Sequence, residues 1–247
     1  MNWKHLTFYT RNWQIYLWPQ IVYGHWTYLN KDPGRIEVMD YMHTARSVED
    51  RLLSYRKDES GWKTCKKTND VVVYWRPSCE FAGYVYKGEG IVNGSPEKVW
   101  DCLKPEINGL RVKWDANIKK FELLEQVSAD VSVCRTVTPS AAMGIISPRD
   151  FVDVISIKRY EDGTVSSNAT NVSHPNCPPQ PGYVRGFNHP CGCFCVPVPG
   201  EPGKTQLFSF FQTDLGGLLP RSVVDSFFPT SMVEFYSNLT KAVKSLK

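Results

Sequence analysis

The end of the chain carries its longest regular apolar pattern. From about residue 224 onwards, apolar side chains recur at steps of three and four, which predicts one long helix ending at Lys247. The stripe consists of Val224, Phe227, Phe228, Met232, Phe235, Tyr236, Leu239, Val243 and Leu246. It is too apolar for an ordinary surface helix, so it must lie against a broad apolar surface. That surface is either a filled core or the wall of a cavity.

The middle of the chain shows short runs that are typical of strands. We expect strands over residues 71–76, 84–92, 118–127, 131–138, 151–159, 164–172, 183–196 and 206–214. Asp162-Gly163 provides the positive backbone angles of a tight hairpin turn. Helices are expected over residues 44–57, with acidic residues early and basic residues late, and over residues 96–103. Sequential hairpins between an early helix and a final helix predict an α+β fold with an antiparallel sheet.

Two connections differ from ordinary solvated loops. Residues 139–148 join neighbouring strands but contain Met143, Ile145 and Ile146, which a solvated loop would not normally expose. We expect another element to cover them, or a lipid to contact them. Residues 174–182 are rich in proline and are interpreted as a stiff excursion outside the sheet.

The first forty residues differ in composition from the rest. Trp3, Trp13, Trp18 and Trp26 are half of the 8 tryptophans of the chain. Residues 13–29 carry no Lys, Arg, Asp or Glu, but the run is too short and too interrupted for a transmembrane helix. We interpret residues 1–40 as an aromatic-rich extension, an irregular tail, with a membrane-interface segment or an extra hairpin as the alternatives. Residues 41–247 form the predicted domain.

Charge and cysteine content narrow the function. The chain has 29 basic and 25 acidic residues, a net charge of +4 that is spread along the sequence. We therefore expect no nucleic-acid partner, while weak attraction to an anionic membrane stays open. The 8 cysteines are too sparse for a disulfide scaffold, and no signal sequence is recognisable. These features favour reduced thiols and a cytoplasmic protein.

Candidate reactive groups are few. Cys191, Cys193 and Cys195 alternate along a predicted strand, which favours packed free thiols over a tetrahedral zinc site. Asp150 and Asp153 are expected to pair with nearby bases, for which Arg149 and Arg159 are available. No phosphate loop, dinucleotide motif or nucleophile elbow is present, so we expect no metal, no cofactor and no catalysis.

Three motifs resemble those of a known family. They are SPRDFVD at residues 147–153, YVRGFNHPCG at residues 183–192 and QTDLG at residues 212–216. Together they resemble the START domains, the lipid-transfer domains related to steroidogenic acute regulatory protein. The resemblance covers residues 51–247, and LRVKWD at residues 110–115 is most similar to the small START-only proteins that bind cholesterol.

The resemblance implies a helix-grip fold, in which a curved antiparallel sheet wraps around a long C-terminal helix and encloses a lipid tunnel. It implies ligand contacts at Arg111, Ser166, Ile155, Val133, Trp114, Phe187, Phe228 and Met232. It also implies a lid, which we expect to contact membranes through Met143, Ile145, Ile146, Leu218 and Leu219. Pro229 removes a backbone donor from the predicted helix and is either a harmless kink or the place where the lid flexes. The steroidogenic members carry an acid and an arginine where this chain has Lys113 and Ile155. The choice among cholesterol, oxysterols, bile acids and other lipids therefore stays open.

The expected function is non-catalytic binding and transfer of one sterol between membranes by a monomer that touches membrane surfaces transiently. The alternative is a ligand-gated sensor that binds a bile acid or another lipid and recruits a protein partner. For that role, residues 1–38 offer the recognition surface. An enzyme acting on a bound polycyclic substrate is a third hypothesis, which requires converging acid and base groups.

Overall fold

A large curved antiparallel sheet forms the centre of the protein. The computed structural model describes residues 40–246, and the predicted extension of residues 1–40 lies outside this part except for Asp40. The strand order is β1 (Lys63–Lys67), β2 (Val72–Pro77), β3 (Tyr84–Asn93), β11 (Lys204–Phe211), β10 (Cys191–Pro197), β7 (Val165–Asn171), β6 (Arg149–Arg159), β5 (Val131–Val137) and β4 (Lys120–Gln126). Two-residue β8 (Val184–Arg185) pairs with β6 in parallel, and β9 (Phe187–Asn188) pairs with β12 (Thr213–Asp214).

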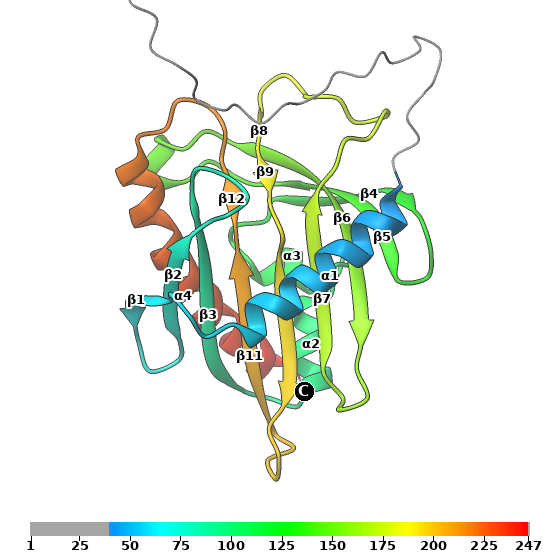
Figure 1. Ribbon diagram of the computed structural model, residues 1–247, viewed down its shortest axis with the longest axis vertical. Coiled ribbons are helices and arrows are strands. Elements are labelled where there is room, and N and C mark those ends of the chain that lie inside the picture. The colour runs from blue at the N-terminus through cyan, green and yellow to red at the C-terminus, as the bar shows by residue number, and fades with distance from the viewer. Residues whose placement is uncertain (1–39, 247) are drawn as a thin grey trace, which may run out of the picture. The chain divides into compact units, whose positions relative to one another are not determined.

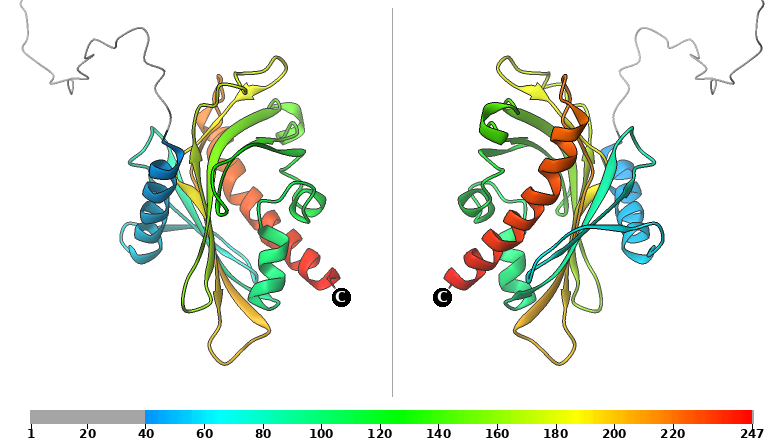
Figure 2. Two further views of the ribbon diagram at one scale, coloured as in Figure 1. Left: turned by 90° about the vertical axis from the view of Figure 1, so that its right-hand side faces the viewer. Right: turned by 90° about the vertical axis from the view of Figure 1, so that its left-hand side faces the viewer.

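Helices cover the two faces of the sheet unequally (Figures 1 and 2). Helix α1 (Tyr41–Lys57) crosses one face, which we call the outer face. The inner face holds α2 (Pro96–Leu103), the single turn α3 (Arg111–Trp114) and the long α4 (Arg221–Ser245). This arrangement confirms the predicted α+β helix-grip fold. Among the described residues, no helix is long and apolar enough to cross a bilayer.

Helix α1 is fixed by its cap and by its apolar face. The Asp40 carboxylate accepts a hydrogen bond of 2.9 Å from the backbone N–H of His43, which satisfies a free donor of the first turn. Arg56 in the last turn suits the negative end of the helix dipole. Val48 and Leu52 are buried in a cluster with side chains of the outer face. These contacts complete the core on this side of the sheet.

Helix α4 is held to the inner face along its C-terminal half. Leu239 and Val243 pack in one core cluster with α2 and the adjacent strands. The Tyr236 hydroxyl lies 2.9 Å from the carbonyl oxygen of Leu207 and 3.0 Å from Ser209 Oγ, and burial raises the pKa of this phenol. Gly88 lets the helix approach β3, because a Cβ there would lie 2.9 Å from the ring of Tyr236. The helix therefore has a rigid seat on β3 and β11.

The predicted elements agree with the structure in type but not in every boundary. The hairpins, the short α2 and the long C-terminal helix are present. The strand expected over residues 183–196 is wrong, because the chain forms β8, β9 and β10 instead. At the break, Gly186 lies so close to Phe151 that a Cβ would come within 2.3 Å of its ring. Strand β1 and α3 were not predicted, since KTCKK lacks apolar alternation and α3 is only one turn long.

Asp150, itself fully buried, organises an ion cluster on β6. Arg185 binds both of its oxygens at 2.9 and 3.0 Å, and Arg135 Nε lies 2.9 Å from Oδ2. Burial opposes ionisation of Asp150, but the hydrogen bonds from the two arginines outweigh it and hold the pKa of the carboxyl below its usual value. The predicted pairing with Arg149 or Arg159 is therefore wrong for Asp150.

Arg185→Ala is expected to lower the free energy of unfolding by about 3 kcal/mol, because it leaves a buried carboxylate without its bidentate partner. Urea denaturation at pH 7 measures this change. Arg159→Ala, at the exposed end of β6, is the control and is expected to change stability by less than about 0.5 kcal/mol. Equal effects of the two substitutions would contradict the role given to the cluster.

Candidate ligand-binding cavity

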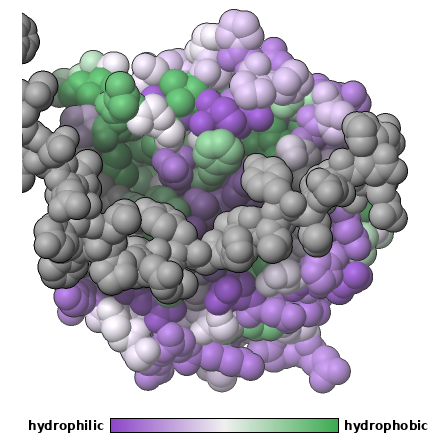
Figure 3. All heavy atoms as spheres, turned by 45° about the horizontal axis from the view of Figure 1, so that its top comes forward, coloured by the Kyte–Doolittle hydropathy of each residue, from purple (hydrophilic) through white to green (hydrophobic). Residues whose placement is uncertain are grey.

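A cavity of about 300 Å³ lies between the inner face of the sheet and α4. Its volume is at the lower end of the range of small-molecule sites, about 300–1,000 Å³. Residues from β6, β7, β10 and β11, from the 139–148 connection and from α4 line it. Figure 3 shows a hollow at the end of the molecule that is uppermost in Figure 1, with hydrophobic residues gathered beside it.

Strand alternation decides which side chains reach the cavity. Phe151, Asp153 and Ile155 of β6 line it, as do Ser167 and Ala169 of β7. Successive residues of a strand point to opposite faces, so the residues between them point toward α1. A run that is buried on both faces thus has two functions: one set of side chains packs under α1 and the other forms the wall of the cavity.

Helix α4 supplies the apolar wall opposite the sheet. Phe227, Phe228, Met232 and Phe235 line the cavity from the N-terminal and middle part of the helix. Phe228 also stacks on Tyr86 of β3, with ring centroids 5.4 Å apart. The apolar stripe read from the sequence therefore has two parts, one that lines the cavity and one, from Tyr236 onwards, that packs into the core.

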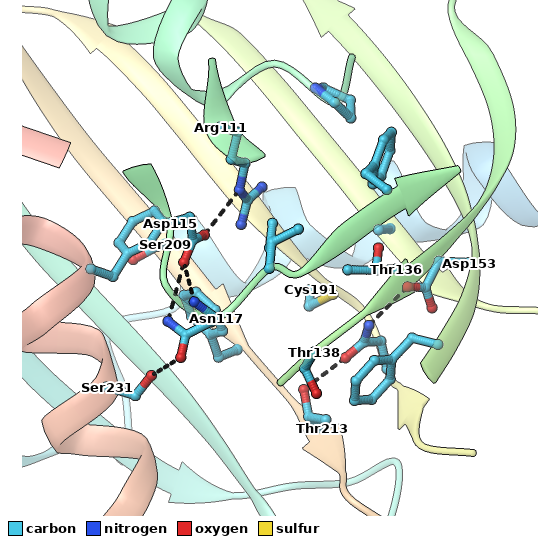
Figure 4. Close-up of a pocket in the computed structure, with 18 of the residues that line it drawn as sticks. Arg111, Asp115, Asn117, Thr136, Thr138, Asp153, Cys191, Ser209, Thr213 and Ser231 are labelled. Atoms are coloured by element: carbon cyan, nitrogen blue, oxygen red, sulfur yellow. Dashed lines mark hydrogen bonds and ion pairs between the residues drawn. The ribbon is translucent and has the colours of Figure 1, made fainter. Parts of the chain in front are cut away.

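A first polar network connects α3 to α4 (Figure 4). Arg111 Nε lies 3.2 Å from Asp115 Oδ2, an i,i+4 pair across the single turn of α3. Asn117 Nδ2 donates to Asp115 Oδ1 at 3.2 Å, and Ser231 Oγ of α4 donates to Asn117 Oδ1 at 3.2 Å. All four residues line the cavity. The network gives the cavity a positively charged group that is already held in place.

A second polar group lies on β6, apart from Arg111 in Figure 4. Asp153 is 4% exposed, and its Oδ2 accepts a hydrogen bond of 2.8 Å from Asn188 Nδ2. The Asn188 Oδ1 accepts in turn from Thr213 Oγ1 at 2.7 Å. Burial raises the pKa of Asp153 to about 7, and the weaker opposing influences are the Asn188 bond and the charge of Arg185. The carboxyl therefore changes its protonation state close to neutral pH.

Arg149 joins two connections at the edge of the cavity. It is buried and lines the cavity, and its guanidinium donates to the carbonyl oxygens of Ser147, Leu215 (3.0 Å) and Gly216 (3.4 Å). Burial lowers its pKa. Ser147 belongs to the 139–148 connection, and Leu215 and Gly216 belong to the connection that leads into α4. One side chain thus holds the two expected lid segments together.

The structure brings part of the predicted set together. Arg111, Ile155, Phe228, Met232 and the predicted lid residue Ile146 all line the cavity. That they contact a ligand stays a prediction.

Other predicted contact residues lie elsewhere. Ser166 and Val133 are fully buried on the side toward α1, because on their strands Ser167 and Thr136 are the ones that alternate into the cavity. Trp114 donates from Nε1 to the carbonyl oxygen of Cys102 at 2.9 Å, outside the lining. Phe187 is half exposed on β9. This placement differs from the prediction and gives these four residues no direct access to the cavity.

The remaining lid residues differ in exposure. Met143, Ile145 and Leu218 are exposed, and the first and last of them are fully exposed. Leu219 is partly buried and packs against the main core cluster. Pro229 lies inside α4, which continues through it from Arg221 to Ser245. The flexing of α4 at Pro229 stays a prediction.

The sequence-based prediction missed Asp153, Asn188 and Arg149 as cavity residues. Asp153 carried a usable signal, since Ile155 was assigned to the cavity and a residue two positions earlier on a strand shares its face. Asn188 carried no such signal, because it contacts Asp153 only where the expected strand is broken into β8, β9 and β10. Arg149 was read as an ion-pair partner, whereas its acceptors are backbone carbonyls from distant loops.

Comparison with known proteins assigns the family. A family model described as "START domain" matches residues 44–247. The chain belongs to the START domain family. Human StAR-related lipid transfer protein 5 is 62% identical over 200 residues, which cover 81% of this chain and 94% of that protein. Human StAR-related lipid transfer protein 6 is 36% identical over a region that covers 84% of this chain and 93% of that protein.

Solved structures agree with the START assignment. The structure of human StAR-related lipid transfer protein 5 matches with a TM-score of 0.80 at 60% identity, covering 83% of this chain and 96% of that one. Human STARD10 matches with a TM-score of 0.70 at 20% identity, covering 87% and 84%, and shows the shared fold. The START resemblance read from the sequence motifs is confirmed.

Asp153→Asn is expected to gain stability relative to the unchanged protein as the pH rises. Between pH 3.8, its ordinary pKa, and about pH 7, Asp153 holds a proton in the folded protein that it has lost in the unfolded chain. Its contribution to the free energy of unfolding therefore falls as the pH rises through this range. From pH 5 to pH 7 the free energy of unfolding of the variant, relative to the unchanged protein, should rise by about 2 kcal/mol. Chemical denaturation at several pH values measures the difference.

Asp162→Asn is the matched control, because the pKa of this exposed turn carboxyl lies below its ordinary value. The difference in free energy of unfolding between Asp162→Asn and the unchanged protein should stay constant between pH 5 and pH 7. A flat difference for Asp153→Asn as well would show that Asp153 titrates at the usual acidic pH.

Proposed function

We propose that the protein binds one sterol, cholesterol or a related molecule, and carries it between membranes without chemical change. In this proposal it works as a cytoplasmic monomer that touches membrane surfaces transiently. The observation that carries the proposal is the cavity between the sheet and α4, whose wall combines apolar side chains, many of them from α4, with polar side chains. The names of the relatives, which include lipid transfer proteins 5 and 6, support the same class of function.

The size and lining of the cavity favour a compact, weakly polar ligand. A volume of about 300 Å³ lies within the range of sites that hold one small molecule. Aromatic residues of α4 offer flat apolar surfaces, as a rigid ring system requires. Arg111 and Asp153 are two of the polar residues of the wall where a polar group of the ligand can be bound.

The energetics fit a carrier. Enclosing a few hundred Å² of apolar surface at about 25 cal/mol per Å² gains on the order of 10 kcal/mol relative to water. A sterol in a bilayer is already out of water, so its transfer into the protein is nearly balanced in free energy. The protein acts by lowering the cost of crossing the aqueous phase between two membranes.

The groups that line the cavity support a non-catalytic role. Burial raises the pKa of the Cys191 thiol strongly, so that the nucleophilic thiolate is disfavoured at neutral pH. Arg111 is engaged by Asp115, and one of the two oxygens of Asp153 is bound to Asn188. Among the described residues, no group of three or more His, Cys, Asp or Glu side chains could hold a metal ion.

The exposed apolar side chains give the proposal its membrane contact. Met143 and Ile145 lie on the 139–148 connection, and Leu218 lies on the connection before α4. Arg149 links these two connections, so their tips belong to one end of the cavity. An apolar tip that enters the interface of a bilayer would give the ligand a path that avoids water.

Ala169→Phe is expected to weaken binding of the fluorescent sterol dehydroergosterol at least tenfold. Ala169 lines the cavity, and an added ring would occupy part of the space for the ligand. The surrounding side chains are close-packed and cannot move away to make new space. Titration followed by sterol fluorescence measures the affinity. Ala129→Phe, on the exposed turn between β4 and β5, makes the same change outside the cavity and should bind normally. Normal binding by folded Ala169→Phe would refute the cavity as the site.

The double substitution Ile145→Glu and Leu218→Glu is expected to slow transfer of dehydroergosterol between phosphatidylcholine vesicles about fivefold or more. The substitutions replace two apolar side chains with carboxylates, which enter the bilayer interface at a high cost in free energy. The cavity itself is unchanged. Equilibrium sterol binding should therefore stay the same. Ile91→Glu, at an exposed position of β3, is the control. Unchanged transfer by the double variant would reject the lid tips as the membrane contact.

A further inference from the structure

We propose that Asp153 Oδ1 is the group that binds the hydroxyl of the carried sterol. The inference rests on the proposed function and assigns the polar end of the ligand to a point on β6, apart from Arg111 (Figure 4). Neither the family motifs nor the sequence pattern had singled out Asp153 for this role.

The hydrogen bonds around Asp153 leave one of its oxygens free. Oδ2 accepts from Asn188 Nδ2 at 2.8 Å. Oδ1 is buried and has no hydrogen-bond partner anywhere in residues 40–246. Asp153 is one of the residues that line the cavity, so the oxygen without a partner belongs to a side chain of the cavity wall. A buried polar atom without a partner is costly, and a ligand that supplies the partner removes that cost.

The orientation of Asn188 is fixed from several sides. Its Oδ1 accepts from Thr213 Oγ1 at 2.7 Å, and its amide nitrogen donates to Asp153. Its backbone carbonyl accepts from Asn171 Nδ2 at 2.8 Å and from Thr170 Oγ1 at 3.3 Å. These bonds hold β9 against β7 and prevent Asn188 from rotating to donate a hydrogen bond to Asp153 Oδ1. The free oxygen is therefore built into the fold.

The chemistry of a carboxyl group with one free oxygen selects a hydroxyl. The titratable groups that influence Asp153 or are influenced by it are Cys134 on β5, Cys191 on β10 and Arg185 on β8. The raised pKa means that both protonation states are populated near neutral pH. A hydroxyl can donate to the carboxylate and can accept from the acid, whereas a ketone can only accept. An anionic carboxylate ligand would be repelled by the ionised form.

Three matched steroids test the assignment by competition with dehydroergosterol at pH 8, where Asp153 is mostly ionised. Cholestanol carries a 3-hydroxyl, cholestanone carries a ketone at that position, and cholestane carries neither. The unchanged protein should bind cholestanol at least tenfold more tightly than the other two. Asp153→Leu should lose the preference for cholestanol over cholestane, to less than threefold.

Asp153→Asn gives a second, nearly isosteric readout. Its amide oxygen would accept from Asn188, so its NH₂ would face the cavity and donate equally to a hydroxyl or a ketone. The preference for cholestanol over cholestanone should fall below threefold in this variant. Asp130→Leu, on the exposed turn between β4 and β5, is the control and should keep both preferences.

The outcomes separate this inference from the proposed function. Failure of the unchanged protein to bind dehydroergosterol would refute sterol binding itself. Sterol binding with no preference for cholestanol, or a folded Asp153 variant that keeps the preference of the unchanged protein within twofold, would overturn the Asp153 assignment alone. Thermal melting shows that each variant is folded, and if Asp153→Leu does not fold, the ketone comparison in Asp153→Asn decides.

Discussion

The packing of α4 on β3 is the contact on which the rest of the structure depends. Gly88 brings the helix close to the strand, and the buried Tyr236 hydroxyl binds Ser209 and the backbone of β11. Because the C-terminal half of α4 is seated in this way, its N-terminal half extends along the curved inner face without having to fill it. The cavity is what the curvature of the sheet leaves when one long helix is fixed at one end.

The polar groups of the cavity are supported by residues from other elements. Asp115 and Asn117 hold Arg111 in place, and Asn188 and Thr213 hold one side of Asp153. Such support keeps polar groups in an apolar wall at fixed positions, so a ligand meets a preformed pattern instead of ordering flexible side chains. With the role proposed for Asp153, the same arrangement would let a cavity that binds mostly by shape distinguish ligands that differ in one oxygen atom.

Much of the fold could be predicted from the sequence, because it depends on periodicity. The stripe of α4, the Asp162-Gly163 turn and the alternation in the hairpins are local signals, and the structure contains all of them. The cavity wall was harder to predict. Ser166 and Val133 were placed by resemblance, and their strands turn them toward α1 instead. Asn188 and Arg149 could not be predicted, since their partners come from loops that only the folded chain brings together.

Arg149 has a consequence for how the cavity can open. Its guanidinium binds carbonyl oxygens from both connections at the cavity edge, and it has no carboxylate partner among the described residues. Moving either connection away from Arg149 removes some of its acceptors and leaves a buried cation incompletely hydrogen-bonded. Intermediate positions are therefore disfavoured. The two segments should separate cooperatively, as a latch with two states, and not by gradual independent fluctuation.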